Sequence, residues 1–149
     1  MTQAEQNKAV VRAFIDAVNA QAWERLDDLV AVDVIRHGPA SGQGPLRSRV
    51  ELKAFLRREA ATFPDAHEAV HFLVAEGDKV AALLGFRGAQ RGALGPFPAS
   101  GRTLTADFIA IFRVAGGRIT EVWVAWDSWG ALIQLGHVQP MLTHDRASR

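Results

Sequence analysis

The chain has 149 residues, the length of one domain with a substantial core, so we expect a single domain over residues 1–149. Its net charge of +1 gives no electrostatic reason to expect nucleic acid or an acidic membrane surface as a partner. The absence of cysteine excludes disulfides, thiol chemistry and thiolate metal sites.

Both ends of the chain are polar. The first ten residues, MTQAEQNKAV, lack the apolar region of a signal peptide, and no apolar run approaches membrane-spanning length. We therefore expect a cytoplasmic protein that does not bind membranes. The last ten residues, 140–149, are expected to form a frayed tail.

Helical signals dominate the first part of the chain. Thr2 and Glu5 form a capping box before a stripe of apolar residues at helical spacing. Ser48 and Glu51 repeat this pattern before a second stripe. Further short elements are expected as helices over 22–30 and 128–136, and as a strand over 33–39.

From residue 66 onward the apolar period changes to that of strands. We expect strands over 66–75, 79–87, 103–114 and 118–127, with turns at Gly77-Asp78 and Gly116-Gly117. Helices followed by long antiparallel strands indicate an α+β fold. One bent sheet covered on one face by the three N-terminal helices would form a cone, whose apolar interior is a natural small-molecule pocket.

Residues 67–71 read HEAVH, the pattern that binds zinc when it lies on a helix. Here Pro64 precedes the pattern and β-prone residues follow it, so we expect a strand. In a strand, His67 and His71 share a face but lie about 13 Å apart. Two ligands of one zinc ion need nitrogen atoms within about 4 Å of each other, so the sequence predicts no metal site.

The segment GAQRGALGPFPASG, residues 88–101, connects the two middle strands and is rich in glycine and proline. So long a connection is unnecessary between adjacent antiparallel strands. We interpret it as a mobile lid or rim over the mouth of the cone.

The segment FRVAGGRITEVWVAWDSWGALIQLG, residues 112–136, resembles the SnoaL-like polyketide cyclases of the nuclear-transport-factor-2-like superfamily. Earlier landmarks agree: FPDAH at 63–67, EGDKV at 76–80 and FPASGR at 97–102. The resemblance spans about residues 8–138. Its matching positions in the last third are Phe112, Arg113, Gly117, Arg118, Ile119, Glu121, Trp123, Asp127, Gly130, Gln134, Leu135 and Gly136.

The resemblance implies a cone-shaped fold and catalysis without a cofactor. In that family a carboxylate on the strand before the closing helix is the general acid/base of an intramolecular aldol ring closure, and Asp127 has that position here. Relatives often carry G-T-H before the Gly/Pro loop, whereas this chain has Gly88-Ala89-Gln90. Gln90 thus places an amide where an imidazole is common, at an expected pocket position.

Asp127 has two interpretations. An Asp between a strand and a helix is a frequent N-cap, which accepts a hydrogen bond from a backbone N–H. Alternatively it is the catalytic acid/base, and strand alternation then puts Glu121 and Trp123 on its face, with Trp123 as a pocket wall. A buried carboxyl beside room for a substrate would support an enzyme, and a carboxylate engaged in capping would support a binding protein.

Other candidate substrate-binding residues have equally plain structural alternatives. His37 is either a pocket donor or a surface histidine, and His71 lines the cone or lies on the outer sheet face. Phe14 belongs to the core and, near the mouth, to the pocket lining. Solvated charges are the simplest interpretation of Arg36, Arg57, Arg58 and Arg91.

The sequence therefore predicts a SnoaL-like enzyme that binds a small hydrophobic, carbonyl-containing or polycyclic molecule and needs no cofactor. Alternatives are an isomerase, a dehydratase or an epoxide hydrolase of the same fold, or a non-catalytic binding or docking module, because a fold does not fix a function. The sheet face without helices carries alternate apolar residues, so we expect a homodimer or tetramer.

Overall fold

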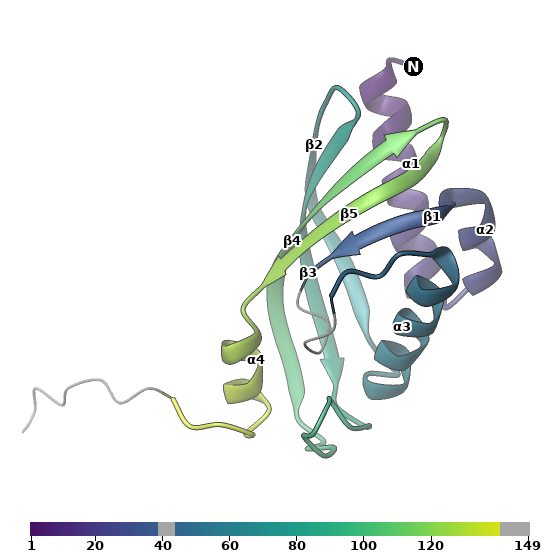
Figure 1. Ribbon diagram of the computed structural model, residues 1–149. Helices are drawn as coiled ribbons and strands as arrows, with labels where there is room; N and C mark the ends of the chain where they lie inside the picture. The colour runs from purple at the N-terminus through teal and green to yellow at the C-terminus, as the bar shows by residue number, and fades with distance from the viewer. Residues whose placement is uncertain (39–43, 141–149) are drawn as a thin grey trace, which may run out of the picture.

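A computed structural model describes residues 1–38 and 44–140, and the expected frayed tail lies almost entirely outside them. It shows a curved five-stranded sheet with three N-terminal helices along one side (Figure 1). The elements in chain order are α1 (Gln3–Asn19), η1 (Trp23–Arg25), α2 (Leu26–Leu29), β1 (Val30–His37), α3 (Arg49–Thr62), β2 (His67–Glu76), β3 (Lys79–Ala89), β4 (Thr103–Ala115), β5 (Arg118–Trp126) and α4 (Ser128–Gln134).

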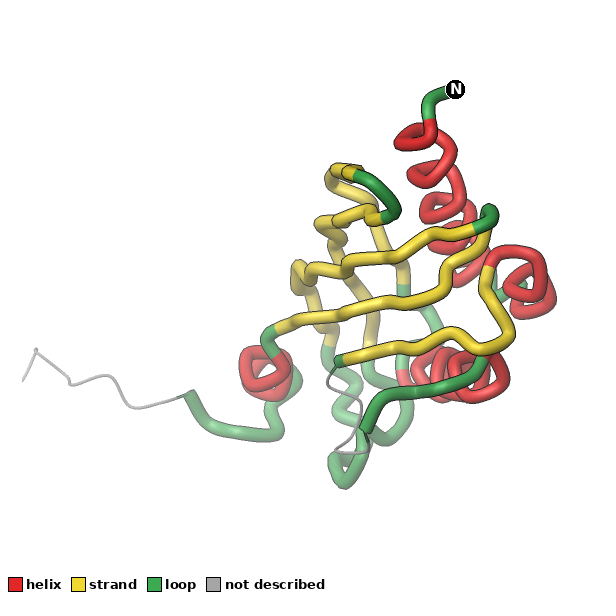
Figure 2. Tube along the Cα trace, turned by 45° about the horizontal axis from the view of Figure 1, so that its top comes forward, coloured by secondary structure: helices red, strands yellow, loops and turns green. Residues whose placement is uncertain are grey.

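The sheet is mixed and open. Its strand order is β1-β5-β4-β3-β2, so that β1 and β2 form the two edges. β1 runs parallel to β5, and all other neighbours are antiparallel. The predicted α+β fold is confirmed, with a curved sheet covered on one face by α1, α2 and α3 (Figure 2).

The predicted helix starts are confirmed in atomic detail. Thr2 Oγ1 accepts the N–H of Glu5 at 3.2 Å, and the Thr2 N–H donates to Glu5 Oε2 at 3.0 Å. Ser48 Oγ accepts the N–H of Glu51 at 3.1 Å. Each contact satisfies a backbone donor that a helix leaves without an internal partner. None of the described helices combines the length and apolar character needed to cross a membrane.

The core lies between the inner face of the sheet and the helices. Alternate residues of β3 and β4 are buried there against α1, while the intervening residues face away. A second cluster closes one end of the sheet, where α4 packs beside β4. The buried residues of this second cluster are Phe63, Leu104, Ala131 and Leu135.

The opposite, outer face of the sheet carries exposed apolar side chains. Phe72 and Val74 of β2 are 53% and 57% exposed, and Ile109 and Ile111 of β4 are 52% and 37% exposed. Strand register brings them together, because β3 residues pair with both strands. These four residues are called the outer apolar patch below.

The segment after β3 is held more closely than its composition suggested. Gln90 is fully buried, and its side-chain N–H groups donate to the carbonyl oxygens of Gly92 and Pro98, both at 3.1 Å. Gln90 Oε1 accepts a hydrogen bond from His137 Nε2 at 2.7 Å. Arg91 N–H also donates to the carbonyl of Thr62, at the end of α3. The side chain of Gln90 therefore ties this segment to the C-terminal part of the chain.

We predict that Gln90→Ala destabilises the fold and frees residues 91–101. The substitution removes three hydrogen bonds of a fully buried side chain, each with a net contribution of about 0.5–1.5 kcal/mol. Urea unfolding should show the loss, and amide hydrogen exchange should accelerate in this segment. Arg91→Ala, which removes an exposed side chain, is the matched control. Unchanged exchange in Gln90→Ala would contradict the anchoring role.

Candidate functional site

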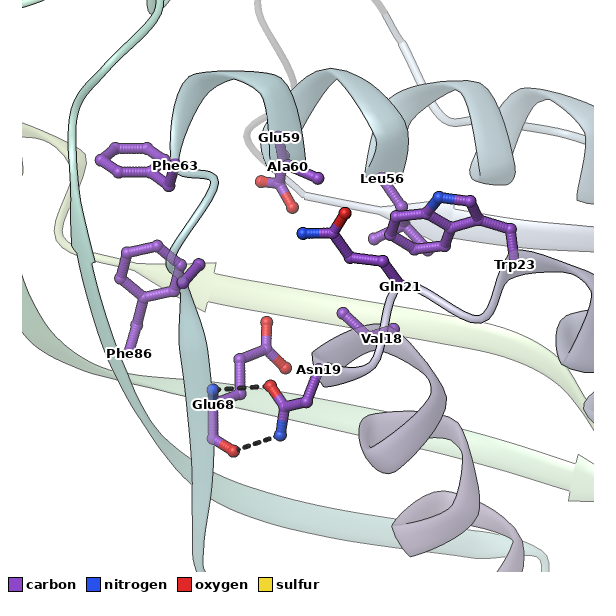
Figure 3. A pocket seen from close by; sticks show the side chains of 11 residues that line it. Val18, Asn19, Gln21, Trp23, Leu56, Glu59, Ala60, Phe63, Glu68 and Phe86 are labelled. Atoms are coloured by element: carbon purple, nitrogen blue, oxygen red, sulfur yellow. Dashed lines mark hydrogen bonds between the residues drawn. The ribbon is translucent and has the colours of Figure 1, made fainter.

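A pocket lies where the C-terminal ends of α1 and α3 meet β2 and β3 (Figure 3). Its cavity volume is about 30 Å³, and the wider hollow of about 390 Å³ around it includes open solvent. Apolar side chains form most of its wall, and two carboxylates face into it. The lining residues are Val18, Asn19, Gln21, Trp23, Leu56, Glu59, Ala60, Phe63, Ala66, Glu68 and Phe86.

The two carboxylates reach the pocket because of ordinary helix and strand geometry. Glu59 follows the buried Leu56 by three residues on α3, so both side chains lie on the same face of the helix. Glu68 pairs with Phe86 across β2 and β3, and both project from the inner face of the sheet. Figure 3 shows both carboxyl groups directed into the space between the helix and the sheet.

The end of α1 fixes the start of β2. Asn19 Nδ2 donates to the carbonyl oxygen of Glu68 at 2.9 Å, and the Glu68 N–H donates to Asn19 Oδ1 at 2.8 Å (Figure 3). Gln21 has φ +52°, an unusual conformation for a residue other than glycine. Such strain persists only where the surroundings impose it. The chain therefore holds these two amides in defined positions on the pocket wall.

Arg36 lies behind the pocket on the inner face of β1, where it pairs with Val122 of β5. Only 7% of Arg36 is exposed, and its guanidinium group lies 4.3 Å from the centre of the Phe55 ring. Its Nη1 is buried and has no hydrogen-bond partner among residues 1–38 and 44–140. The interpretation of Arg36 as a solvated charge is therefore wrong.

These three charges act on one another. Burial raises the pKa of Glu68 from its ordinary value of 4.5 to about 7, helped by the negative charge of Glu59 and opposed by Arg36. Burial also raises the pKa of Glu59, again opposed by Arg36. Glu59 is nevertheless exposed to solvent, unlike the half-buried Glu68. The pocket can therefore hold or release a proton near neutral pH.

Asp127 lies at the start of α4 and is not among the described residues that line the pocket. It is exposed, and its Oδ1 accepts the N–H of Gly130 at 2.8 Å, which makes it the N-cap of α4. Asp127 therefore has the geometry of a helix cap. The expectation that its carboxyl group is buried among apolar side chains is wrong, because the residue is exposed. A role of Asp127 in catalysis stays a prediction.

Trp123, His37 and His71 lie on the outer face of the sheet, away from the pocket. His37 stacks on Trp123, with ring centres 5.4 Å apart, and its Nε2 lies 2.6 Å from Glu121 Oε2. Trp123 pairs across the strands with Ile111 of the outer apolar patch. His71 Nε2 lies 3.0 Å from Asp107 Oδ1. The expected shared face of Glu121 and Trp123 is confirmed, but the position of Trp123 as a pocket wall is corrected.

Phe14 and Gln90 are also absent from the pocket lining. The Phe14 ring packs edge-to-face against Phe112 in the core, with ring centres 5.8 Å apart. Gln90 holds the segment after β3, and no residue of that segment is among the described residues that line the pocket. A role of this segment as a lid stays a prediction.

The HEAVH pattern lies in β2, which confirms the predicted strand. Within residues 1–38 and 44–140, no three His, Asp or Glu side chains lie close enough together to hold a metal ion. The pattern nevertheless contains a pocket residue, Glu68. The sequence analysis did not single out Glu59 or Glu68 as site residues, although both had a recognisable pattern. Glu59 interrupts the apolar stripe of α3, and Glu68 occupies an inward position of a strand.

A family model described as SnoaL-like polyketide cyclase matches residues 8–135. Among solved structures, TsrD from Streptomyces laurentii is 29% identical, with a TM-score of 0.81 over 93% of this chain and 100% of that chain. IdmH from Streptomyces antibioticus, a proposed polyketide cyclase, is 30% identical, with a TM-score of 0.77 over 88% of this chain and 99% of its own. No curated protein sequence matches the chain.

A proposed SnoaL-like polyketide cyclase from Jannaschia sp. CCS1 has a TM-score of 0.82 over 94% of this chain and 98% of its own. At 18% identity it supports the fold alone.

We predict that Glu68→Gln stabilises the protein at pH 8 but not at pH 4.5. The raised pKa of Glu68 means that the folded state binds its proton more tightly than the unfolded state. Stability from this proton is complete below about pH 4.5 and is lost as the pH rises to about 7. The gain in the variant should be on the order of 3 kcal/mol at most.

Urea unfolding at the two pH values measures this effect. Glu76→Gln, at the exposed end of the same strand, is the control and should show no such pH dependence. Equal stabilities of Glu68→Gln and the parent at both pH values would show that Glu68 titrates normally.

Proposed function

Because the chain belongs to the SnoaL-like polyketide cyclase family, whose model matches residues 8–135, we propose that it is a small-molecule enzyme that needs no cofactor. We assign the general acid/base to Glu68 in preference to Asp127. One observation carries this choice: the Glu68 side chain lines a largely apolar pocket, where burial raises its pKa to about 7. General acid/base catalysis is most efficient when the pKa is near the working pH.

The reaction that fits these groups is an intramolecular aldol ring closure. The substrate lies against Trp23, Phe63 and Phe86, and the Glu68 carboxylate removes a proton from the carbon next to a carbonyl group. The resulting enolate attacks a second carbonyl carbon of the same molecule and forms the new C–C bond. The alkoxide that results takes a proton from a protonated carboxyl, Glu68 or Glu59, so the product is an isomer of the substrate.

A binding protein is the second candidate function, favoured by the capping hydrogen bond of Asp127. Asp127 is also the alternative acid/base, because it has the position of the carboxylate in the family. The two carboxylates can be separated experimentally, since Glu68 lies in the pocket and Asp127 is exposed at the end of β5.

We also propose that a second copy of the chain covers the outer apolar patch. Four exposed apolar side chains on β2 and β4, the two neighbours of β3, are costly in water, and the helices protect only the inner face. The side-chain contacts His37–Glu121 and His71–Asp107 lie on the same face and supply polar groups around the patch.

We predict that Glu68→Gln lowers catalysed proton exchange by on the order of 10²-fold or more. The assay follows exchange of the protons next to the carbonyl of 2-tetralone with D₂O, by NMR, and therefore needs no knowledge of the natural substrate. Asp127→Asn preserves the cap, because Asn caps about as well as Asp, and should exchange like the parent. If only Asp127→Asn loses catalysed exchange, Asp127 is the general acid/base. If the parent protein catalyses no exchange, the second candidate function, a binding protein, is favoured.

We predict that Ile109→Glu converts a dimer into a monomer, because it places a charge in the centre of the outer apolar patch. Sedimentation velocity at micromolar concentration measures the change. Val50→Glu, which alters a 75% exposed residue on α3, is the control and should leave the assembly intact. A parent protein that is already monomeric would refute the proposed dimer.

A further inference from the structure

Gln21 occupies a backbone position that favours glycine. It follows α1 as the left-handed residue of the turn that ends the helix, with φ +52°. Its own N–H donates to the carbonyl oxygen of Val18 at 3.0 Å, and the N–H of the next residue, Ala22, donates to that of Ala17 at 2.9 Å. Glycine is the usual residue at the left-handed position of such a turn, because a side chain there costs free energy. The fold alone would therefore be served better by glycine.

The side chain of Gln21 lines the pocket. Figure 3 shows its amide group directed into the space that Glu59 and Glu68 border. Its Nε2 donates to the carbonyl oxygen of Pro64 at 3.4 Å, a long contact just beyond the end of α3. An amide nitrogen carries two N–H donors, so a second donor remains for a ligand.

A ligand oxygen in this pocket requires a neutral hydrogen-bond donor. The charged side chains among the described lining residues are Glu59 and Glu68, and both repel negative charge on a ligand. Asn19 uses its amide nitrogen and oxygen on the backbone of Glu68. The indole nitrogen of Trp23 is turned away from Glu68 (Figure 3). Of the described lining residues, Gln21 is thus the side-chain donor best placed to meet a ligand oxygen.

The size of the cavity limits what enters it. Its volume of about 30 Å³ is close to the share of one molecule in liquid water, about 30 Å³. One small oxygen-bearing group therefore fits the narrow part, while a ring system has to lie in the wider hollow. The aromatic side chains that line this hollow are Trp23, Phe63 and Phe86.

We propose that the Gln21 amide donates a hydrogen bond to the carbonyl oxygen of the ligand, so that the substrate is a ketone that presents one unhindered carbonyl group to the cavity. The assignment of a substrate rests on the proposed function, and the site for a ligand oxygen does not. When the Glu68 carboxylate takes a proton from the neighbouring carbon, the electron pair of the broken C–H bond moves onto this oxygen. Gln21 keeps its own proton, and its preorganised N–H stabilises the charge as it develops.

The experiment uses 2-naphthol, whose oxygen has the position of the enolate oxygen of 2-tetralone, and measures its affinity by isothermal titration calorimetry. Gln21→Met keeps the length of the side chain but removes the amide, and it should bind about fivefold or more weakly than the parent. Gln21→Gly should show the same loss although its urea midpoint rises, because glycine relieves the backbone strain. Gln6→Met, at an exposed position of α1, is the control and should bind like the parent.

The glycine variant separates binding from folding. A Gln21→Gly protein that is more stable than the parent and binds 2-naphthol less tightly supports the proposal, because loss of structure cannot explain its lower affinity. Equal affinity in the parent and both variants, or no binding to the parent at millimolar concentration, would overturn it. A lower urea midpoint in Gln21→Gly would show that the side chain serves the fold and would also count against the proposal.

The proton-exchange assay distinguishes this inference from the proposed function. If the parent catalyses exchange of 2-tetralone, Gln21→Met should lower the rate by on the order of 10²-fold. An unchanged rate would overturn the role of Gln21 and leave Glu68 as the acid/base. If the parent catalyses no exchange, the proposed reaction fails, and the affinities for 2-naphthol alone decide whether Gln21 holds a ligand oxygen.

Discussion

Alternation of side chains across one curved sheet is the constraint on which the site depends. Every strand residue faces either the helices or the outer surface, and a shift of one position would exchange the two sets. The long register between β3 and β4, from Lys79 paired with Arg113 to Ala89 paired with Thr103, fixes this assignment over eleven pairs. Glu68 and Arg36 lie on the two edge strands and face the interior. Their pairing partners, Phe86 and Val122, already face inward, and directly paired residues share a face.

The same constraint explains which parts of the fold could be predicted. Capping boxes and apolar periods are local signals, so the helix starts at Thr2 and Ser48 and the four long strands could be located from the sequence. Alternation also grouped Glu121 with Trp123 correctly. It could not tell which of the two faces the helices cover, because both sets contain apolar residues. Trp123 was therefore predicted inside the cone although it lies outside.

The candidate site was harder to predict, because its charges resemble surface charges in the sequence. Arg36 follows Ile35 in a short strand, and the parallel pairing of β1 with β5, a contact between distant segments, decides which way it points. Gln90 is the reverse case. It was expected to line the pocket, but its side chain is engaged in hydrogen bonds with Gly92, Pro98 and His137. In both cases tertiary contacts overrode what the local sequence indicated.

The HEAVH pattern shows how strand geometry can assign a familiar motif to different chemistry. On a helix the two histidines would converge on one ion, and the glutamate would activate its water. On β2, alternation places the glutamate and the histidines on opposite faces of the sheet. Glu68 faces inward and pairs with Phe86, while His71 contacts Asp107 on the outer face. Glu68 therefore lies with Glu59 on the largely apolar wall of the pocket, on the opposite face of the sheet from His71. There burial raises its pKa toward neutrality, a change that a carboxylate in water or at a helix cap would not undergo. The backbone that excludes the zinc geometry is thus also the one that makes Glu68 suitable as an acid/base.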